Sequence, residues 1–441
     1  MNRRDEYLQT FITQFVCLFL GVFSSVLASR CLLPEGRGQM GAIQYYPTLL
    51  GTFFPLAVPQ AITLFMSADP KRSDIYSRAG IQISLLLSLL GVILFTIFSP
   101  FTLSVKNSYL IRPVVIACLA AAPMVFIPSI QAIYRGDQQF NWINRSLIIV
   151  AVLYPINLSV LWFLGRLTPL NAVLAGFVGN YLVCGLGVIG KIKQWRAVRV
   201  NLQDYKDLLI QGIRFFGPVL AILLFQMSDR ALLMNLTNLK QLGFYVVAYS
   251  ATYPLTLVTE PFLQIGFVEI ASQNSIENKQ SIFLRRFKLA QVILLPMFFL
   301  MGMFLYPFIR FLQGSEFIPA IYPAYICLIA MFIKSLSRYW ENSLRTVNLN
   351  RTSIFANIFS LVLMAGLAYC FVPNYGVIGF SIILGLVELF KLVFMIYYSK
   401  QIFISGSLKT IFFNRSDIEL VLEHVKEVVS KMRKSTTRAR E

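Results

Sequence analysis

The sequence predicts an all-α polytopic membrane protein with about 12 transmembrane helices and both termini in the cytoplasm. The first observation is composition, because 57% of the residues are hydrophobic and only 13% are charged. The second is that apolar stretches of roughly 20 residues, each long enough to cross about 30 Å of hydrocarbon, recur along the chain. These stretches are too long for the alternating strands of a membrane barrel. The third observation is that Lys and Arg concentrate in alternate loops, as expected when cytoplasmic loops are enriched in positive charge.

Each apolar stretch predicts one helix, with bounds that are uncertain by a few residues. The predicted spans are Leu8–Ser29, Gly41–Met66, Ala79–Phe98, Val114–Tyr134, Ser146–Leu164, Leu170–Ile189, Leu209–Leu233, Gly243–Ile270, Phe287–Phe311, Ala320–Thr346, Ser353–Val372 and Val377–Ser399. Proline removes a backbone hydrogen bond and bends a helix, so we expect kinks in the second, fourth and eighth spans. The prolines concerned are Pro47, Pro55, Pro59, Pro123, Pro128, Pro254 and Pro261.

The formal net charge of +19 is explained by topology without a nucleic-acid partner. With both termini inside, about 28 of the 39 Lys and Arg residues fall on the cytoplasmic side. Only about eight fall on the other side, namely Arg30, Arg37, Lys106, Arg112, Arg166, Arg230, Lys240 and Arg310. The first apolar run is also too long for the core of a signal peptide, so we expect a retained span. The sequence therefore predicts a multi-pass protein of the cell inner (plasma) membrane.

A hydrophilic basic stretch after the sixth span divides the chain. It predicts an N-terminal six-helix bundle at 1–190, a cytoplasmic linker at 191–207, a C-terminal six-helix bundle at 208–400 and a cytoplasmic tail at 401–441. Trp195 suits a linker that lies on anionic lipid headgroups, and a solvated linker is the alternative. The two halves share a short repeated motif, because Gln39-Met40-Gly41 opens the second span and Gln241-Leu242-Gly243 opens the eighth. Such a parallel repeat is typical of transporters whose substrate lies between the halves.

The tail has its own pattern, which predicts an amphipathic helix followed by a basic segment. Ser416 and Glu419 form a capping-box pattern, and apolar residues then recur at helical spacing up to Met432. Such a helix could lie on the membrane, pack under the bundle or dock a partner protein.

The tenth span carries an unusual row of charged residues. Lys334, Arg338, Glu341 and Arg345 are spaced so that all four lie on one face of a helix. A charge inside a bilayer costs about 2.5–3.5 kcal/mol or more, so these side chains are expected to face protein or a wet cavity. A structural alternative stays open, in which the arginines reach the interface and Glu341 pairs with Arg345.

Other polar residues within spans are weaker candidates. Arg214 is either a cytoplasmic-side cavity cation or an interfacial residue, and Asp229 either pairs with Arg230 or takes part in proton or sodium coupling. Glu260 is a candidate coupling carboxylate because it lies beside helix-breaking residues. Glu388 and Lys391 predict a structural pair. Side chains suited to hydrogen bonds with sugar hydroxyls are Gln14, Gln44, Tyr45, Gln60, Gln82 and Asn157.

Metal and cofactor chemistry have no support in the sequence. The six cysteines stand singly, and the single histidine, His424, lies in the tail. Because no CxxC or Cys/His spacing occurs, we expect no disulfide framework, no metal site and no cofactor beyond an undetermined H⁺ or Na⁺ coupling. No Gly-rich loop or P-loop pattern of a nucleotide enzyme occurs either.

Short motifs in order along the chain carry a family resemblance. The stretch Arg30-Cys31-Leu32-Leu33-Pro34-Glu35-Gly36-Arg37-Gly38 resembles the "R-L-L-G-P-E-x-x-G" turn of polysaccharide exporters of the multidrug/oligosaccharidyl-lipid/polysaccharide (MOP) flippase superfamily, which includes Wzx-like oligosaccharide flippases. Further matches are Asp229-Arg230, Gly243 to Tyr249, Gly314 to Phe317 and Val372 to Gly379, so the likeness covers nearly all of residues 1–400. Leu33 stands where the family usually has glycine.

The resemblance implies two six-helix bundles of the MATE/MOP-like kind around a central cavity. It also implies a polyprenyl-pyrophosphate-linked oligosaccharide as substrate, membrane lipids as surroundings and polysaccharide-assembly proteins as candidate partners. A pyrophosphate needs fixed cations on its route, and Lys334 and Arg338 are our first choices, with Glu341 orienting Arg338 or Arg345. The carboxylate found in the first span of some cation-coupled relatives is absent here, since Asp5 and Glu6 precede that span.

The sequence thus predicts a non-enzymatic, alternating-access flippase for a lipid-linked glycan in cell-surface polysaccharide biosynthesis. One alternative is a MATE-like exporter of drugs or other small molecules with the same fold. A membrane-embedded glycosyltransferase or polymerase would need carboxylates or a metal site in sizeable loops, and the loops here are mostly short. A scaffolding protein with an inactive cavity is the remaining alternative.

Overall fold

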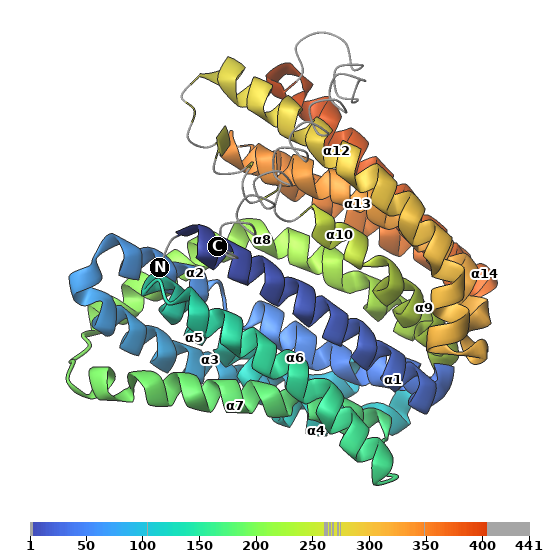
Figure 1. The fold of residues 1–441 in the computed structure, drawn as a ribbon, viewed down its shortest axis with the longest axis horizontal. Coiled ribbons are helices and arrows are strands. Elements are labelled where there is room, and N and C mark those ends of the chain that lie inside the picture. The colour runs from blue at the N-terminus through green and yellow to red at the C-terminus, as the bar shows by residue number, and fades with distance from the viewer. Residues whose placement is uncertain are drawn as a thin grey trace, which may run out of the picture. The chain divides into compact units, whose positions relative to one another are not determined.

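The computed structural model describes a helical chain (Figure 1). It covers residues 3–403 apart from 104, 260–262, 264–265, 267–268, 271–272, 274 and 348. The predicted tail helix and basic segment, and the candidate Glu260, therefore lie outside the described residues.

Every regular element in the described part of the chain is a helix. The α-helices are α1 (Arg3–Phe53), α2 (Val58–Ala68), α3 (Ser73–Thr102), α4 (Ile111–Leu119), α5 (Ala122–Gly136), α6 (Phe140–Phe163), α7 (Pro169–Arg196), α8 (Leu202–Leu236), α9 (Leu239–Thr252), α10 (Pro254–Val258), α12 (Ile276–Pro307), α13 (Ile321–Thr346) and α14 (Asn350–Phe403). Shorter turns of other helix types are η1 (Pro70–Arg72), η2 (Val105–Leu110), η3 (Phe308–Gln313) and η4 (Ser315–Ala320).

Within the described residues, nine helices are long and apolar enough to cross a membrane. Two of these are much longer than a bilayer requires, and each contains a non-helical residue between two predicted spans. The break in α1 is at Leu33, and the break in α14 is at Gly376. The predicted eighth span corresponds to α9, α10 and a following segment that is only partly described.

The helix is interrupted in all three spans for which prolines predicted kinks, and in the eighth span the interruption lies between α9 and α10, just before Pro254. The second predicted span is not one helix, because α1 ends at Phe53 and Leu56 and Ala57 take positive φ after Pro55. The fourth predicted span is divided between α4 and α5 just before Pro123. Pro47 and Pro128, in contrast, lie inside continuous helices, as membrane proteins tolerate.

By contacts between residues the chain forms two compact units. Unit 1 comprises Met1–Ala251, Pro307–Pro323 and Ala365–Phe380, and unit 2 comprises the remaining segments Thr252–Tyr306, Ala324–Met364 and Ser381–Glu441. The predicted bundle boundaries at 190 and 208 remain predictions, and each unit is described by itself.

The core of unit 1 includes the start of the predicted linker. Trp195 is buried and its indole Nε1 donates a hydrogen bond to Ser77 Oγ at 2.8 Å. Lys191 pairs with Asp137 at 2.5 Å, and Arg72 pairs with Asp204, whose carboxylate also caps α8 at Asn201. The interpretation of Trp195 as a headgroup anchor is therefore wrong, because its ring packs inside the protein.

The core of unit 2 is a cluster of aromatic rings from α12, α13 and α14. Phe283 stacks on Phe287 with ring centroids 5.6 Å apart, and it meets the edge of Trp340 at 4.7 Å. Phe403 lies 4.4 Å from Phe283. Because these rings are almost fully buried, they fix the three helices against one another.

Candidate functional site

The charged row of the tenth predicted span lies on α13, in unit 2, and its members differ in burial. Lys334 is 8% exposed and Glu341 is 4% exposed, whereas Arg338 is half-buried and Arg345 is exposed. A long cationic side chain at the end of a span can reach the interface, which suits Arg345. The buried members are the ones whose burial needs an explanation, because each places a polar group at membrane depth.

Glu341 belongs to a hydrogen-bond network with the first part of α14. Its Oε1 accepts hydrogen bonds from Ser353 Oγ at 2.7 Å and from Asn357 Nδ2 at 2.6 Å. Two donors on one carboxylate oxygen hold the side chain in one orientation and offset part of the cost of burying it. The proposed role of Glu341 in orienting an arginine remains a prediction.

A second buried charged pair lies on the last part of α14. Lys391 Nζ is 2.9 Å from Glu388 Oε2, and both side chains are almost completely buried, so the predicted pair is confirmed. Two contacts join α13 to α14, one on each side of this pair along the helix. Cys327 Sγ is 3.4 Å from Ser381 Oγ, and Trp340 Nε1 donates a hydrogen bond to Ser399 Oγ at 2.7 Å. Along α13, Lys334 lies between Cys327 and Trp340. Along α14, Glu388 and Lys391 lie between Ser381 and Ser399. The interior of unit 2 is therefore polar and charged at the depth of Lys334.

The other predicted site residues described by the structure lie in unit 1. Asp229 is buried on α8, and its carboxylate accepts hydrogen bonds from the Tyr245 hydroxyl at 2.7 Å and from the Arg230 backbone N–H at 2.6 Å. Arg214 and Gln60 are exposed. Gln82 and Asn157 have structural partners, since Gln82 accepts from the Tyr205 hydroxyl and Asn157 donates to the Ala175 carbonyl.

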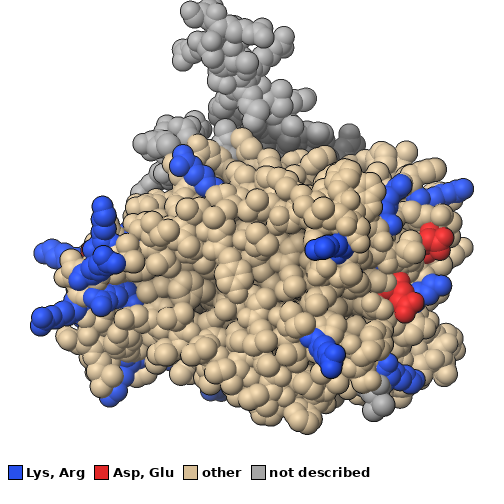
Figure 2. Space-filling view, turned by 90° about the horizontal axis from the view of Figure 1, so that it is seen from below, with Lys and Arg blue, Asp and Glu red and all other residues tan. Residues whose placement is uncertain are grey.

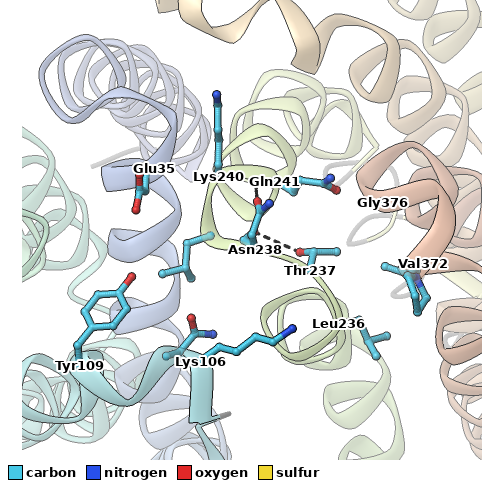
Figure 3. Close-up of a pocket in the computed structure, with 13 residues that line it drawn as sticks. Glu35, Lys106, Tyr109, Leu236, Thr237, Asn238, Lys240, Gln241, Val372 and Gly376 are labelled. Atoms are coloured by element: carbon cyan, nitrogen blue, oxygen red, sulfur yellow. Dashed lines mark hydrogen bonds between the residues drawn. The ribbon is translucent and has the colours of Figure 1, made fainter.

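Unit 1 also contains a polar pocket that the sequence did not indicate (Figure 3). Its volume is about 620 Å³, and it is lined by α1, η2, the turn between α8 and α9, and the break in α14. Lys106 reaches across the pocket towards the end of α8 (Figure 3). Gln241 closes another side, because its Oε1 accepts a hydrogen bond at 2.8 Å from the backbone N–H of Val377, next to Gly376. The sequence signals for this pocket are that Glu35 belongs to the quoted turn motif, Gln241 to the motif that the two halves share, and Val372 and Gly376 to the quoted motif between the last two predicted spans.

A resident metal is not suggested by the described part of the chain, where no group of three His, Cys, Asp or Glu side chains is placed to hold one.

The fold is that of membrane transporters of the MOP superfamily. The structure of the lipid II flippase MurJ in an inward closed conformation matches with a TM-score of 0.75 at 15% identity, covering 92% of this chain and 89% of that chain. An inward-facing multidrug resistance MATE family transporter matches with a TM-score of 0.71 at 14% identity, covering 87% and 94%. A MOP superfamily transporter from Pyrococcus furiosus matches with a TM-score of 0.60 at 14% identity, covering 89% and 93%.

The chain belongs to the polysaccharide biosynthesis protein family, whose model matches residues 8–268, more than half of the chain. No curated protein matches the sequence. The chain is a multi-pass membrane protein, and the solved proteins that share its fold are transporters rather than enzymes. The family resemblance inferred from the motifs is therefore confirmed.

Proposed function

We propose that this protein is a flippase that moves a polyprenyl-pyrophosphate-linked oligosaccharide across the cytoplasmic membrane by alternating access. The observation that carries the proposal is membership of the polysaccharide biosynthesis family on a fold shared with a lipid II flippase. A lipid-linked glycan has a charged head that cannot cross hydrocarbon without polar partners. Polysaccharide-assembly proteins are the partners we expect.

The buried charges of unit 2 support this function. We assign Lys334 and Arg338 to pairing with the pyrophosphate or the adjoining sugars, with Glu341 and Arg345 as supporting residues. Lys334 is buried on α13, where a cation interacts more strongly with a phosphate than it would in water. Arg214 and Gln60 are proposed contacts for the substrate on entry, and Asp229 and Glu260 are proposed sites of H⁺ or Na⁺ coupling.

We further infer about 12 spans in two six-helix bundles, with both termini in the cytoplasm. This count treats the breaks in α1 and α14 as the junctions between two spans each. It also treats α9 and α10 as the beginning of the eighth span. Alternating access then requires the two bundles to move relative to each other around the substrate.

The decisive experiment reconstitutes the full-length protein in proteoliposomes. A fluorescent polyprenyl-pyrophosphate disaccharide reports flipping when it becomes accessible to an impermeant quencher, and uptake of an organic cation is measured in parallel. We expect the lipid-linked disaccharide to flip and the organic cation to stay. Transport of the cation with no flipping of the glycan lipid would identify a MATE-like exporter instead.

The site assignment has a separate test in the same assay. The double variant Lys334→Ala/Arg338→Ala should flip at least about tenfold more slowly, because a hydrogen bond to a charged group contributes about 1.5–3 kcal/mol. The control is Arg351→Ala, an exposed arginine at the start of α14, which should flip at the wild-type rate. Flipping by the double variant at the wild-type rate would refute the site and leave the function standing.

A further inference from the structure

Three charged side chains line the polar pocket of unit 1. Lys106 comes from η2, Lys240 from α9 and Glu35 from α1. All three are exposed, and none of them forms an ion pair within the part of the chain that the structure describes. Lys106 reaches across the pocket (Figure 3). The pocket therefore carries a surplus of one positive charge, which attracts a ligand with a single negative group.

The rest of the pocket wall offers neutral hydrogen-bonding groups in fixed positions. Asn107 is 6% exposed, and its Nδ2 donates to the Met234 carbonyl at 3.1 Å. Asn238 Oδ1 accepts a hydrogen bond at 2.9 Å from the backbone N–H of Gln241, whose own side chain is held by Val377. An amide side chain has two donor hydrogens and an acceptor oxygen. Each of these three amides therefore keeps hydrogen-bonding capacity for a ligand.

The four segments that form the pocket are all junctions between an odd-numbered predicted span and the next even-numbered one. The break in α1 joins the first and second spans, and η2 lies between the third and fourth. The turn between α8 and α9 joins the seventh and eighth, and the break in α14 joins the last two. Such junctions share one side of the membrane, which the positive-inside bias makes the outer side. The proposed flippase would deliver its substrate to that side.

We propose that this pocket is an outer-side binding site for an acidic saccharide, a short glycan segment that carries one carboxylate. Sugar hydroxyls both donate and accept, as the amides of the wall do, and the surplus lysine charge matches the carboxylate. A volume of about 620 Å³ is that of a small-ligand site. A phosphate ion matches the wall less well, because it brings more negative charge towards Glu35. The inference rests on the proposed function, which supplies the glycan.

An occupied pocket should hold this end of unit 1 closed. The pocket is lined by α1 and by the turn between α8 and α9, which belong to different predicted bundles. The two segments are in close contact, since a Cβ atom on Gly38 would overlap the carbonyl of Leu239, a residue of the pocket wall. Alternating access, as proposed, separates the bundles on the outer side. A ligand that bridges them favours the closed conformation, so external acidic saccharide should slow flipping.

The test measures binding of a disaccharide of glucuronic acid and N-acetylglucosamine to the purified full-length protein in detergent, by titration calorimetry. We expect saturable binding. Neutral N,N′-diacetylchitobiose and inorganic phosphate should each bind at least about tenfold more weakly. The double variant Lys106→Gln/Lys240→Gln should weaken binding about fivefold or more, because it removes both positive partners of the carboxylate. Glu35→Gln should strengthen binding about twofold or more, because it removes a like charge.

Arg112→Gln is the matched control. Arg112 is an exposed arginine at the start of α4, on the same predicted side and outside the pocket wall, so this variant should bind like the wild type. An equal loss of affinity in Arg112→Gln would indicate non-specific attraction to surface charge and would overturn the site. Absence of saturable binding, unchanged affinity in the double lysine variant, or equally tight binding of inorganic phosphate would each overturn it as well.

Flipping in proteoliposomes tests the hold on the outer end. Saturating disaccharide on the side of Lys106 should slow flipping by the wild type at least about fivefold, and the double lysine variant should lose most of this inhibition. Binding with no effect on the flipping rate would refute the closing role. Lysine-dependent binding by a protein that flips no glycan lipid would refute the proposed function alone. Flipping without saturable binding of the disaccharide would refute only this site.

Discussion

Leu33 has a backbone conformation that residues with a side chain rarely adopt. Its φ of 60° and ψ of 175° fall in a region that is essentially reserved for glycine. It also precedes Pro34, which restricts the preceding residue to negative, extended φ. The equivalent break in α14 has a glycine, Gly376, at φ 56°. The turn motif that this stretch resembles has glycine at the position of Leu33, which would adopt this backbone conformation without strain.

We predict that Leu33→Gly stabilises the protein. Strain of this kind costs about 1–3 kcal/mol, glycine loses about 0.5–1 kcal/mol through the entropy of the unfolded chain, and the Leu33 side chain is 53% exposed, so little packing is lost. The net gain should be about 1 kcal/mol, measured as a higher midpoint of thermal unfolding in detergent. Leu89→Gly, at an exposed leucine inside α3, should instead lower stability by about 1 kcal/mol. A fall in the midpoint for Leu33→Gly would contradict the assignment of strain.

At the same scale, residue spacing indicated part of the candidate site and could not indicate every buried charge. The spacing of Lys334 and Glu341 placed them on one helix face, and both are buried on α13. Arg37 appeared as one of the outer-side charges and within the quoted turn motif, and neither position predicts that its side chain is buried. Its burial depends on Ser25, Met40 and Tyr154, and only the packing of α1 and α6 brings Tyr154 to it.

At the scale of elements, α1 and α9 approach each other at a point where both have glycine. A Cβ atom on Gly38 would overlap the carbonyl of Leu239, and one on Gly243 would overlap the carbonyl of Pro34. Two helices can cross at this distance only where side chains are absent, as in small-residue contacts between membrane helices. Both glycines belong to the quoted motifs, and Gly243 is also the last residue of the short motif that the two halves share. The motif glycines therefore have a packing role.

We predict that Gly38→Ala and Gly243→Ala each destabilise this conformation. The new methyl group meets backbone, which cannot move aside as a flexible side chain would, so the loss should be about 1–3 kcal/mol or more. Thermal unfolding of the purified variants measures it. Gly366→Ala is the matched control, because its Cβ would meet nothing within 4 Å in α14, and helix propensity should then raise stability by up to about 1 kcal/mol. Equal stability of Gly38→Ala and Gly366→Ala would exclude a tight crossing.

The sequence predicted where the helices lie more accurately than it predicted where they end. Hydropathy located the spans because a bilayer demands roughly 20 apolar residues whatever the tertiary contacts are. The break after Pro55 is longer than a kink, because Leu56 and Ala57 take positive φ. Helix α8 packs closely there, since a Cβ atom added to Gly212 would lie 2.9 Å from the Leu56 carbonyl oxygen. A contact between residues so distant in the chain leaves no local pattern.

At the scale of the whole molecule, the distribution of Lys and Arg determines how the chain is oriented in the membrane. Figure 2 shows one face on which Lys and Arg gather towards the left and the right, with a broad charge-free stretch of surface between them. The sequence assigns about 28 Lys and Arg to the cytoplasmic side and about eight to the other. Within unit 1, helices α4 and α5 lead from Lys106 to Arg135, and α6 leads from Arg145 to Arg166. Lys106 and Arg166 should therefore lie on one side of the membrane and Arg145 on the other.

Single cysteines in a variant without the six native cysteines test this topology. We expect an impermeant maleimide to label Lys106→Cys and Arg166→Cys in intact cells, because both positions are exposed and lie on the outer side. Arg145→Cys and Lys193→Cys are equally exposed but should be labelled only after permeabilisation, since the positive-inside bias places them in the cytoplasm. Labelling of all four after permeabilisation is the control for accessibility, and the cysteine-free variant is the control for background. The reverse pattern would invert the membrane orientation, and with it the direction in which the proposed flippase would carry its substrate.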